Sequence, residues 1–297
     1  MLEISHNSMS IAKSCWRKYY WTYHEGLKPT HSSSALSLGQ TIHEAFDMFY
    51  KGFSSSEVTQ YIIDKFDTDI ANCSPNDVED LVIARYTAIG MFSYFPTKDL
   101  TDFDKIESEQ EFDVPVARGV RLVGKVDGLV EKDGVRWVRE LKTTGLHFPQ
   151  FEKKSRISAQ ATAYTYAMNK LGKPTTGIIY DYIKKPLLRK RQDEDMNDFG
   201  KRIMKDYRER PGMYYRRHYV YRTEQEIKMF EEDMFALVAD VKEKRDKKDF
   251  YRNTDGCYNF NSECPFYKIC HTPNPDPLTL KLYFTKQERK NKCQTKK

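Results

Sequence analysis

The pattern of hydrophobic and polar residues changes near residue 105. Before it, helical spacing and a proline at a helix start predict three helices, at residues 11–23, 35–50 and 75–94. After it, β-branched residues with partial alternation predict five strands, at 106–114, 120–131, 135–143, 176–182 and 214–221. Two further helices are predicted, at 155–171 and from the Thr223–Glu226 capping box to about 247. We therefore expect an α/β fold with a mixed central sheet flanked by helices, a helical N-terminal part and a cysteine-bearing C-terminal part.

Asp133-Gly134 separates two predicted strands and is a strong signal for a two-residue hairpin. Such a turn pairs 132 with 135 and, further back, Asp127 with Glu140, whose Cβ atoms should lie about 5 Å apart. Lys142 belongs to the same face as Glu140. The two carboxylates would repel by about 3 kcal/mol at an effective dielectric near 20. A divalent cation such as Mg²⁺ between the two carboxylates would replace their repulsion by attraction to the metal. The alternative is that these charged residues form an ordinary solvated strand face.

The chain has 297 residues, 39% of them hydrophobic and 13% aromatic, which suits one large domain or two small ones and argues against disorder. No apolar run reaches the roughly 18 residues that a membrane span needs. The opening residues MLEISHNSMS lack a signal-peptide pattern. We expect a cytoplasmic protein without a membrane partner, in which six cysteines serve as metal ligands or free thiols rather than as disulfides.

The net charge of +6 equals that of the tail, residues 281–297, which holds seven Lys or Arg and one Glu. The rest of the chain is therefore neutral in sum. Within it, residues 184–222 hold thirteen Lys or Arg against six Asp or Glu, interleaved with Tyr207, Tyr214, Tyr215, Tyr219 and Tyr221. Cations follow phosphates and aromatic rings stack on unpaired bases, so this stretch is a candidate DNA contact. Ordinary packing is the alternative for each tyrosine.

Several motifs, in order along the chain, resemble the PD-(D/E)XK nuclease superfamily, and its RecB-like branch most closely. Residues 124–145, GKVDGLVEKDGVRWVRELKTTG, resemble the catalytic hairpin, with Asp127 followed by Glu140-Leu141-Lys142. Gly39 and His43 match a helical motif of that branch, and Gln160 and Tyr164 match its Q-x-x-x-Y helix. The proline that precedes the aspartate in the family is Val126 here.

The resemblance implies a restriction-endonuclease-like core and a role for each matching residue. His43, Asp127 and Glu140 would bind a catalytic Mg²⁺ or Mn²⁺ together with the backbone carbonyl of Leu141. A histidine ligand favours Mn²⁺ modestly. Lys142 would be the catalytic lysine. Gln160 and Tyr164 would support the site and contact DNA.

Four of the six cysteines resemble an iron–sulphur staple. Cys257, Cys264 and Cys270 lie close together near the C-terminus, and Cys15 lies in the first predicted helix. One early and three late cysteines resemble AddB-type and CRISPR-adaptation nucleases, which implies a [4Fe-4S] cluster, although the spacing from Cys257 to Cys264 is longer than is usual there. Zinc is the alternative metal, since thiolates bind both, and free thiols are the remaining possibility. Cys73 and Cys293 have no matching partners and are interpreted as ordinary.

Together these features predict a metal-dependent DNA nuclease. We expect an exonuclease that processes DNA with single-stranded ends in replication, recombination or repair, in a bacterium or a phage-infected host cell. No Walker A motif is present, so a helicase or recombination partner would be a separate protein. The alternatives are a nuclease that trims DNA for CRISPR spacer acquisition and a non-catalytic iron–sulphur DNA-binding subunit. We expect one nuclease domain over 1–280, comprising a helical part (1–100), a catalytic core (101–222) and a cluster region (223–280), followed by a basic tail (281–297).

Overall fold

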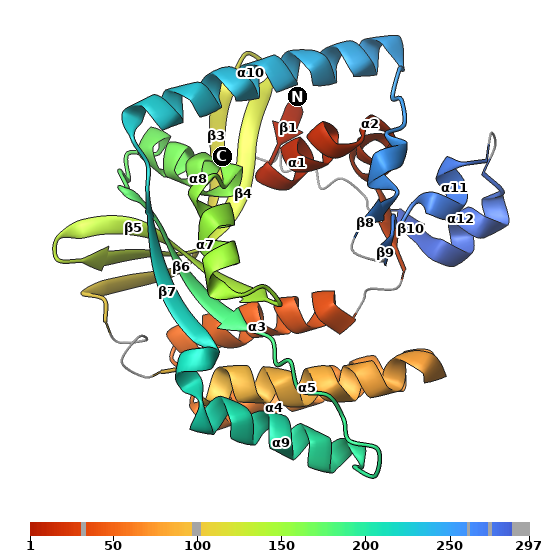
Figure 1. The fold of residues 1–297 in the computed structure, drawn as a ribbon. Helices are drawn as coiled ribbons and strands as arrows, with labels where there is room; N and C mark the ends of the chain where they lie inside the picture. The colour runs from red at the N-terminus through yellow and green to blue at the C-terminus, as the bar shows by residue number, and fades with distance from the viewer. Residues whose placement is uncertain (31–33, 97–101, 260–261, 273–274, 287–297) are drawn as a thin grey trace, which may run out of the picture. The chain divides into compact units, whose positions relative to one another are not determined.

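The structure is a computed structural model that describes residues 1–30, 34–96, 102–259, 262–272 and 275–286 (Figure 1). The chain forms two compact units. The first comprises Ser33–Phe230 with Met1, and the second comprises Leu2–Ser32 and Glu231–Lys297. The hairpin that carries Asp127 and Glu140 belongs to the first unit, and the four cysteines proposed as a staple belong to the second. The boundaries expected for a single nuclease domain remain a prediction.

A mixed sheet forms the centre of the first unit, which confirms the predicted fold class. Its described strands lie in the order β3-β4-β5-β6-β7, with β5 and β6 parallel and the other neighbouring pairs of this series antiparallel. A parallel pair needs a crossover connection, which α7 and α8 provide. The strands span Lys105–Ala117 (β3), Val120–Lys132 (β4), Val135–Thr144 (β5), Gly177–Lys184 (β6) and Tyr215–Tyr221 (β7).

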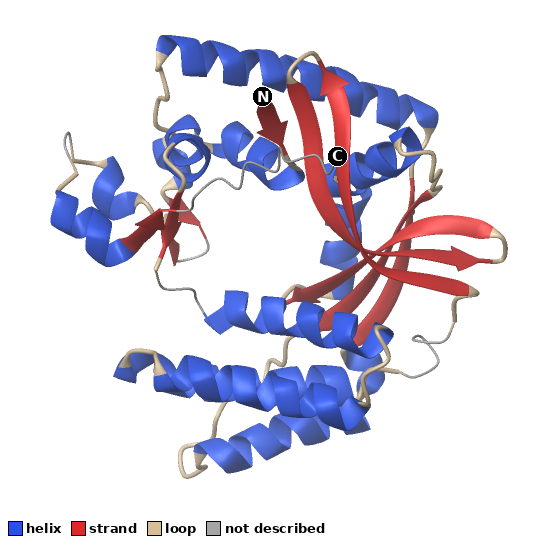
Figure 2. Ribbon diagram, turned by 180° about the vertical axis from the view of Figure 1, so that it is seen from behind, coloured by secondary structure: helices blue, strands red, loops and turns tan. Residues whose placement is uncertain are grey.

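Helices pack on the sheet, and four of them lie side by side in one layer (Figures 1 and 2). The core of this layer contains Ile42, Phe46 and Phe66, and Leu141 of β5 reaches into it. Glu140, the neighbour of Leu141, points to the opposite face and meets α8. The layer consists of α3 (Ser34–Tyr50), α4 (Ser55–Ala71), α5 (Val78–Ser93, preceded by a 3-10 turn at Pro75–Asp77) and α9 (Met196–Glu209, followed by a 3-10 turn at Pro211–Met213). The crossover helices are α7 (Phe148–Arg156) and α8 (Ala159–Lys170).

Residues from both ends of the chain build the second unit. Strand β10 (Phe284–Lys286) pairs with β2 (Leu27–Pro29), and Phe266 and Phe284 pack with Trp21 in a small core. The helix predicted over 11–23 is interrupted, because Cys15 has an extended backbone with φ −166°. The remaining elements are β1 (Leu2–Ile4), α1 (His6–Ser14), α2 (Trp16–Tyr19), a π-helical turn (Tyr20–His24), α10 (Glu224–Lys247, which begins in the first unit), a 3-10 turn (Thr254–Gly256), β8 (Tyr258–Asn259), β9 (Ser262–Glu263), α11 (Tyr267–Cys270) and α12 (Pro277–Tyr283). No helix of the described residues is long and apolar enough to cross a membrane.

The predicted hairpin turn is present between β4 and β5. Asp133 and Gly134 both have positive φ angles, 53° and 74°, as a type I′ turn requires. The register runs from Lys132 opposite Val135 back to Gly128 opposite Arg139. The turn therefore sets the alignment of both strands.

We predict that Gly134→Ala lowers the free energy of unfolding by about 1 kcal/mol, because a residue with a Cβ is strained at that positive φ. Gly145→Ala is the matched control, since it also has open space around its Cβ but no such φ. Denaturant unfolding of both variants measures the difference. Equal stability of the two variants would contradict the importance of the turn.

Candidate active site

Asp127 lies where the ladders of β4 are interrupted. The residue pairs between β4 and β5 end at Gly128–Arg139, one position before Asp127 and Glu140. The residue pairs between β4 and β3 leave out Asp127 and Glu109. Asp127 Oδ2 accepts a hydrogen bond from the Leu141 amide at 2.8 Å. The expected direct opposition of Asp127 and Glu140 is therefore not formed, because the strands separate one position earlier. The carboxylate of Asp127 meets the backbone of β5 instead.

Glu140 is the centre of a connected polar group on the opposite face of the sheet. Its Oε1 accepts hydrogen bonds from Lys142 Nζ at 2.6 Å and from Gln160 Nε2 at 2.8 Å. Gln160 Nε2 also lies 3.0 Å from the hydroxyl of Tyr164, one turn further along α8. The structure thus brings together the carboxylate, the lysine and both residues of the Q-x-x-x-Y motif.

His43 of α3 contacts Asp127 from the helical layer. Its Nδ1 lies 3.0 Å from Asp127 Oδ2. One turn earlier, Gly39 faces Thr143 of β5, and a Cβ at position 39 would lie 3.6 Å from the Thr143 hydroxyl. The small residue at 39 allows α3 to approach β5 closely, which places His43 beside the hairpin.

The charges of these groups depend on burial and on one another. Burial raises the pKa of the Glu140 carboxyl, and the Lys142 ammonium opposes this only in part. Burial would lower the pKa of Lys142, but the Glu140 carboxylate outweighs it and raises that pKa. For Asp127, burial favours the neutral form, yet the hydrogen bond and charge of His43 hold its pKa below the usual value. Burial opposes protonation of His43, but Asp127 raises its pKa overall.

One buried oxygen at the site is suited to a cation. Glu140 Oε2 has no hydrogen-bond partner in the described part of the chain, and an unpaired buried polar atom is costly. Carboxylates with one imidazole suit Mg²⁺ or Mn²⁺. Within the described residues, however, no three His, Cys, Asp or Glu side chains already converge as a metal site. A cation would therefore have to displace part of the contacts that Asp127 and Glu140 make with His43 and Lys142.

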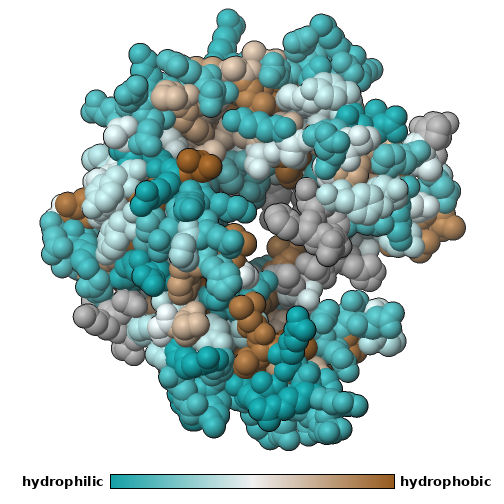
Figure 3. All heavy atoms as spheres, viewed as in Figure 1, coloured by the Kyte–Doolittle hydropathy of each residue, from teal (hydrophilic) through white to brown (hydrophobic). Residues whose placement is uncertain are grey.

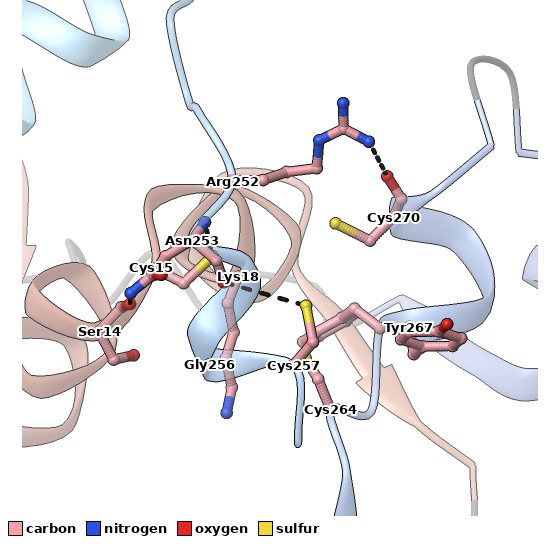
Figure 4. A pocket seen from close by; sticks show the side chains of 11 residues that line it. Ser14, Cys15, Lys18, Arg252, Asn253, Gly256, Cys257, Cys264, Tyr267 and Cys270 are labelled. Atoms are coloured by element: carbon pink, nitrogen blue, oxygen red, sulfur yellow. Dashed lines mark hydrogen bonds between the residues drawn. The ribbon is translucent and has the colours of Figure 1, made fainter. Parts of the chain in front are cut away.

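The four staple cysteines line a single cavity of about 50 Å³ in the second unit (Figure 4). Cys15, Cys257 and Cys270 are directed toward a common space. The backbone amide of Asn253 donates to Cys15 Sγ at 3.4 Å. Among the described residues, none of the four forms a disulfide, and here too the side chains do not form a closed ligand set.

Cys73 lies apart from this cavity, in the first unit. Its thiol donates to the Ile70 carbonyl at the end of α4, at 3.2 Å. This packing is consistent with an ordinary cysteine. Cys293 lies outside the described residues.

The tyrosines of residues 184–222 do not form the stacking surface that the sequence suggested. Tyr207, Tyr214 and Tyr215 are buried in the core between α5, α9 and the sheet. Tyr221 is exposed but packs edge-on against Trp137, with ring centroids 4.8 Å apart. Hydrophobic burial accounts for three of the five rings, so these are structural residues.

The cations of the same stretch are also largely engaged. Arg217 and Arg222 have side chains only 9% and 3% exposed, and both bond within the protein. Lys201 and Lys205 of α9, and Arg210 directly after it, pair with acidic residues of that helix. Hydrophilic residues predominate on the face shown in Figure 3, yet this stretch offers less free positive charge than its composition implied.

Two features beside the site were not found from the sequence. Arg139 of β5 is buried, and both it and Arg217 hold the Asp181 carboxylate at 2.7 Å. A small cavity at His43 and Asp127 is also lined by Asp47 and Glu109. The placement of Arg139 next to Glu140 in a strand rich in buried residues was the available signal. Asp47 and Glu109 could not be found from the sequence, because they lie far apart along the chain and only the packing of α3 and β3 brings them to the same cavity.

A comparison with protein families found a match. An acidic hairpin with a lysine, beside a parallel strand pair joined by helices, has the side chains to hold a cation and act on a phosphodiester. The sequence model of the PD-(D/E)XK nuclease superfamily matches residues 3–271, and the chain belongs to this superfamily. The superfamily indicates a metal-dependent nuclease, with Mg²⁺ or Mn²⁺ as the typical cofactor and DNA as the substrate class. No curated protein matched the chain.

We predict that Asp127→Ala, Glu140→Ala and Lys142→Ala each reduce DNA cleavage by at least about a hundredfold, the scale of losing a group that acts on the reacting phosphate. Glu131→Gln is the control, because Glu131 is a carboxylate of the same strand that is paired with Lys105. Cleavage rates with Mg²⁺ and with Mn²⁺, together with circular dichroism, separate catalytic loss from unfolding. Near-normal cleavage by any two of the alanine variants would contradict the site.

Proposed function

We propose that the protein is a metal-dependent exonuclease that processes DNA ends in replication, recombination or repair. The polar group around Glu140 carries this proposal, because it joins a carboxylate with an unpartnered oxygen to Lys142 and Gln160. The order of motifs from His43 to Tyr164 supports the RecB-like branch and an exonucleolytic mode. Replacement of Asp127, Glu140 or Lys142 by other residue types would have favoured a non-catalytic subunit, but all three are present.

Each side chain has a distinct task in the proposed reaction. His43, Asp127 and Glu140 would hold the cation, which when bound polarises the phosphodiester and lowers the pKa of a water nucleophile. Lys142 offers a positive charge to the phosphate and also orients Glu140 through Oε1. Gln160 supports the same oxygen and is itself positioned by α8. Tyr164 holds Gln160 from one turn away.

The proposal places the protein with DNA that carries single-stranded ends. A separate helicase or recombination protein would open longer duplexes. The compartment would be the cytoplasm of a bacterium or of a phage-infected host cell.

We predict that the purified protein, with Mg²⁺ or Mn²⁺, shortens linear DNA from an end and leaves covalently closed circular DNA intact. Linear DNA labelled at the 5′ or the 3′ terminus reports the polarity. Early release of labelled mono- or short oligonucleotides is the expected result. Linearisation of the circle at a comparable rate would instead show an endonuclease, and no cleavage of either DNA would remove the proposed function.

We also propose that Cys15, Cys257, Cys264 and Cys270 hold a [4Fe-4S] cluster, with zinc as the alternative. Four thiols around one cavity supply a donor set that suits either metal. Arg252 and Lys18 border the cavity and would balance the negative charge of thiolates. The side chains would have to move closer together to close around a metal.

We predict that protein purified without oxygen is brown and contains about four irons per chain, and that Cys15→Ser loses most of this iron. Cys73→Ser is the matched control, because that thiol lies in the first unit and bonds to Ile70. Metal analysis and visible absorbance give the readout. One equivalent of zinc without iron would change the assigned metal, and metal-free wild-type protein would remove the site while leaving the nuclease assignment in place.

A further inference from the structure

Ile157 has the most exposed side chain among the large apolar residues that the structure describes, at 86%. It lies between α7 and α8. Scattered exposed apolar side chains are normal on protein surfaces and need no explanation by themselves. The surroundings of Ile157 are what distinguish it.

The backbone on both sides of Ile157 is held from inside the protein. The guanidinium of Arg222, only 3% exposed, donates to the Ser158 carbonyl at 3.1 Å and to the Thr162 hydroxyl at 2.8 Å. It also reaches the Ser155 carbonyl at 3.5 Å. The amide of Ser158 donates to that same Ser155 carbonyl at 3.1 Å. Ile157 is therefore presented by a fixed junction between two helices.

This junction is next to the candidate active site. Ser158 caps α8, and its hydroxyl accepts a hydrogen bond from Tyr180 at 3.1 Å. Tyr180 is the register partner of Glu140 across the β5–β6 pair. Gln160, three residues after Ile157, bonds to Glu140 directly. Ile157 therefore lies three residues before Gln160, which contacts the carboxylate.

Positive charge flanks the apolar tip. Lys153, Lys154 and Arg156 are exposed in the last turns of α7. Cations at such positions attract a phosphate backbone, and an apolar wedge beside them can enter a base step and unstack it.

We propose that Ile157 is a strand-separating wedge, which inserts against the terminal base pair of duplex DNA while Lys153, Lys154 and Arg156 hold the adjacent phosphates. One separated strand then enters the site at Glu140. This inference rests on the nuclease function proposed above and adds how a duplex end is engaged.

Two measurements test the wedge with Ile157→Ser and the control Leu171→Ser, an exposed aliphatic residue (44%) at the other end of α8. The first uses duplex DNA with a fluorescent base analogue at its terminus, bound in Ca²⁺ at saturating protein. Wild-type protein and the control should raise the fluorescence by unstacking the base, and Ile157→Ser should not. The second compares cleavage of blunt duplex with that of the same DNA carrying mismatched, pre-opened ends.

Ile157→Ser should slow cleavage of the blunt duplex by at least about tenfold, because the cost of unstacking the terminal base step is then no longer offset, and leave the pre-opened DNA nearly unchanged. Equal loss on both substrates, or no loss on either, would overturn the wedge. An equal rise in fluorescence with wild-type protein and with Ile157→Ser, or no rise with wild-type protein, would also overturn it. If the wild-type protein cleaves neither DNA, the nuclease function fails, while the fluorescence measurement still decides whether Ile157 unstacks a terminal base.

Discussion

The register of the β4–β5 hairpin is the constraint on which the candidate site depends, because it decides which face of the sheet each charged side chain occupies. A slip of one residue would send Glu140 and Lys142 to the helical layer and bring Leu141 out of it. The type I′ turn at Asp133-Gly134 fixes that register from one end. Burial of Leu141 among the residues of α3 and α5 fixes it from the other.

The site also depends on where the hairpin ends. Beyond Gly128 and Arg139 the two strands separate, and β5 continues beside β6 while β4 continues beside β3. The Leu141 amide is then available to a side chain, and Asp127 takes it. A continuous ladder would have used that amide between backbones. The separation therefore makes room for the carboxylate and for His43 beside it.

Charge compensation extends through the sheet. On one face Glu140 is balanced by Lys142, and on the other Asp181 is held by Arg139 and Arg217. Because Arg139 directly precedes Glu140 in β5, its buried guanidinium lies on the opposite face of the strand from that carboxylate. Buried charges of this kind are tolerated only when paired and hydrogen-bonded, so each pair restricts the rotamers of the strand that carries the site.

The sequence was most informative where a short-range rule decides the structure. The turn, the five strands and the capping box at Thr223 follow from local chemistry, and each was found. Helix α4 was not separately predicted, although Ser54 and Glu57 form a capping box at its start. The basic, tyrosine-rich stretch was misjudged, because residue type alone does not show that Tyr207 is buried or that Arg217 is paired. Only the tertiary fold decides those.

The cysteines of the second unit are another case in which the sequence alone does not show the tertiary contacts. An iron–sulphur staple would join the two ends of the chain, yet β2 already pairs with β10, and Trp21 packs with Phe266 and Phe284. Backbone hydrogen bonds and apolar burial therefore hold the ends together before any metal binds. A cluster at Cys15 would add its binding energy to a unit that is partly built, in contrast to small zinc domains that fold only with their metal. The cluster would then tighten and shape the cavity, and the hairpin and its carboxylates would fold without it.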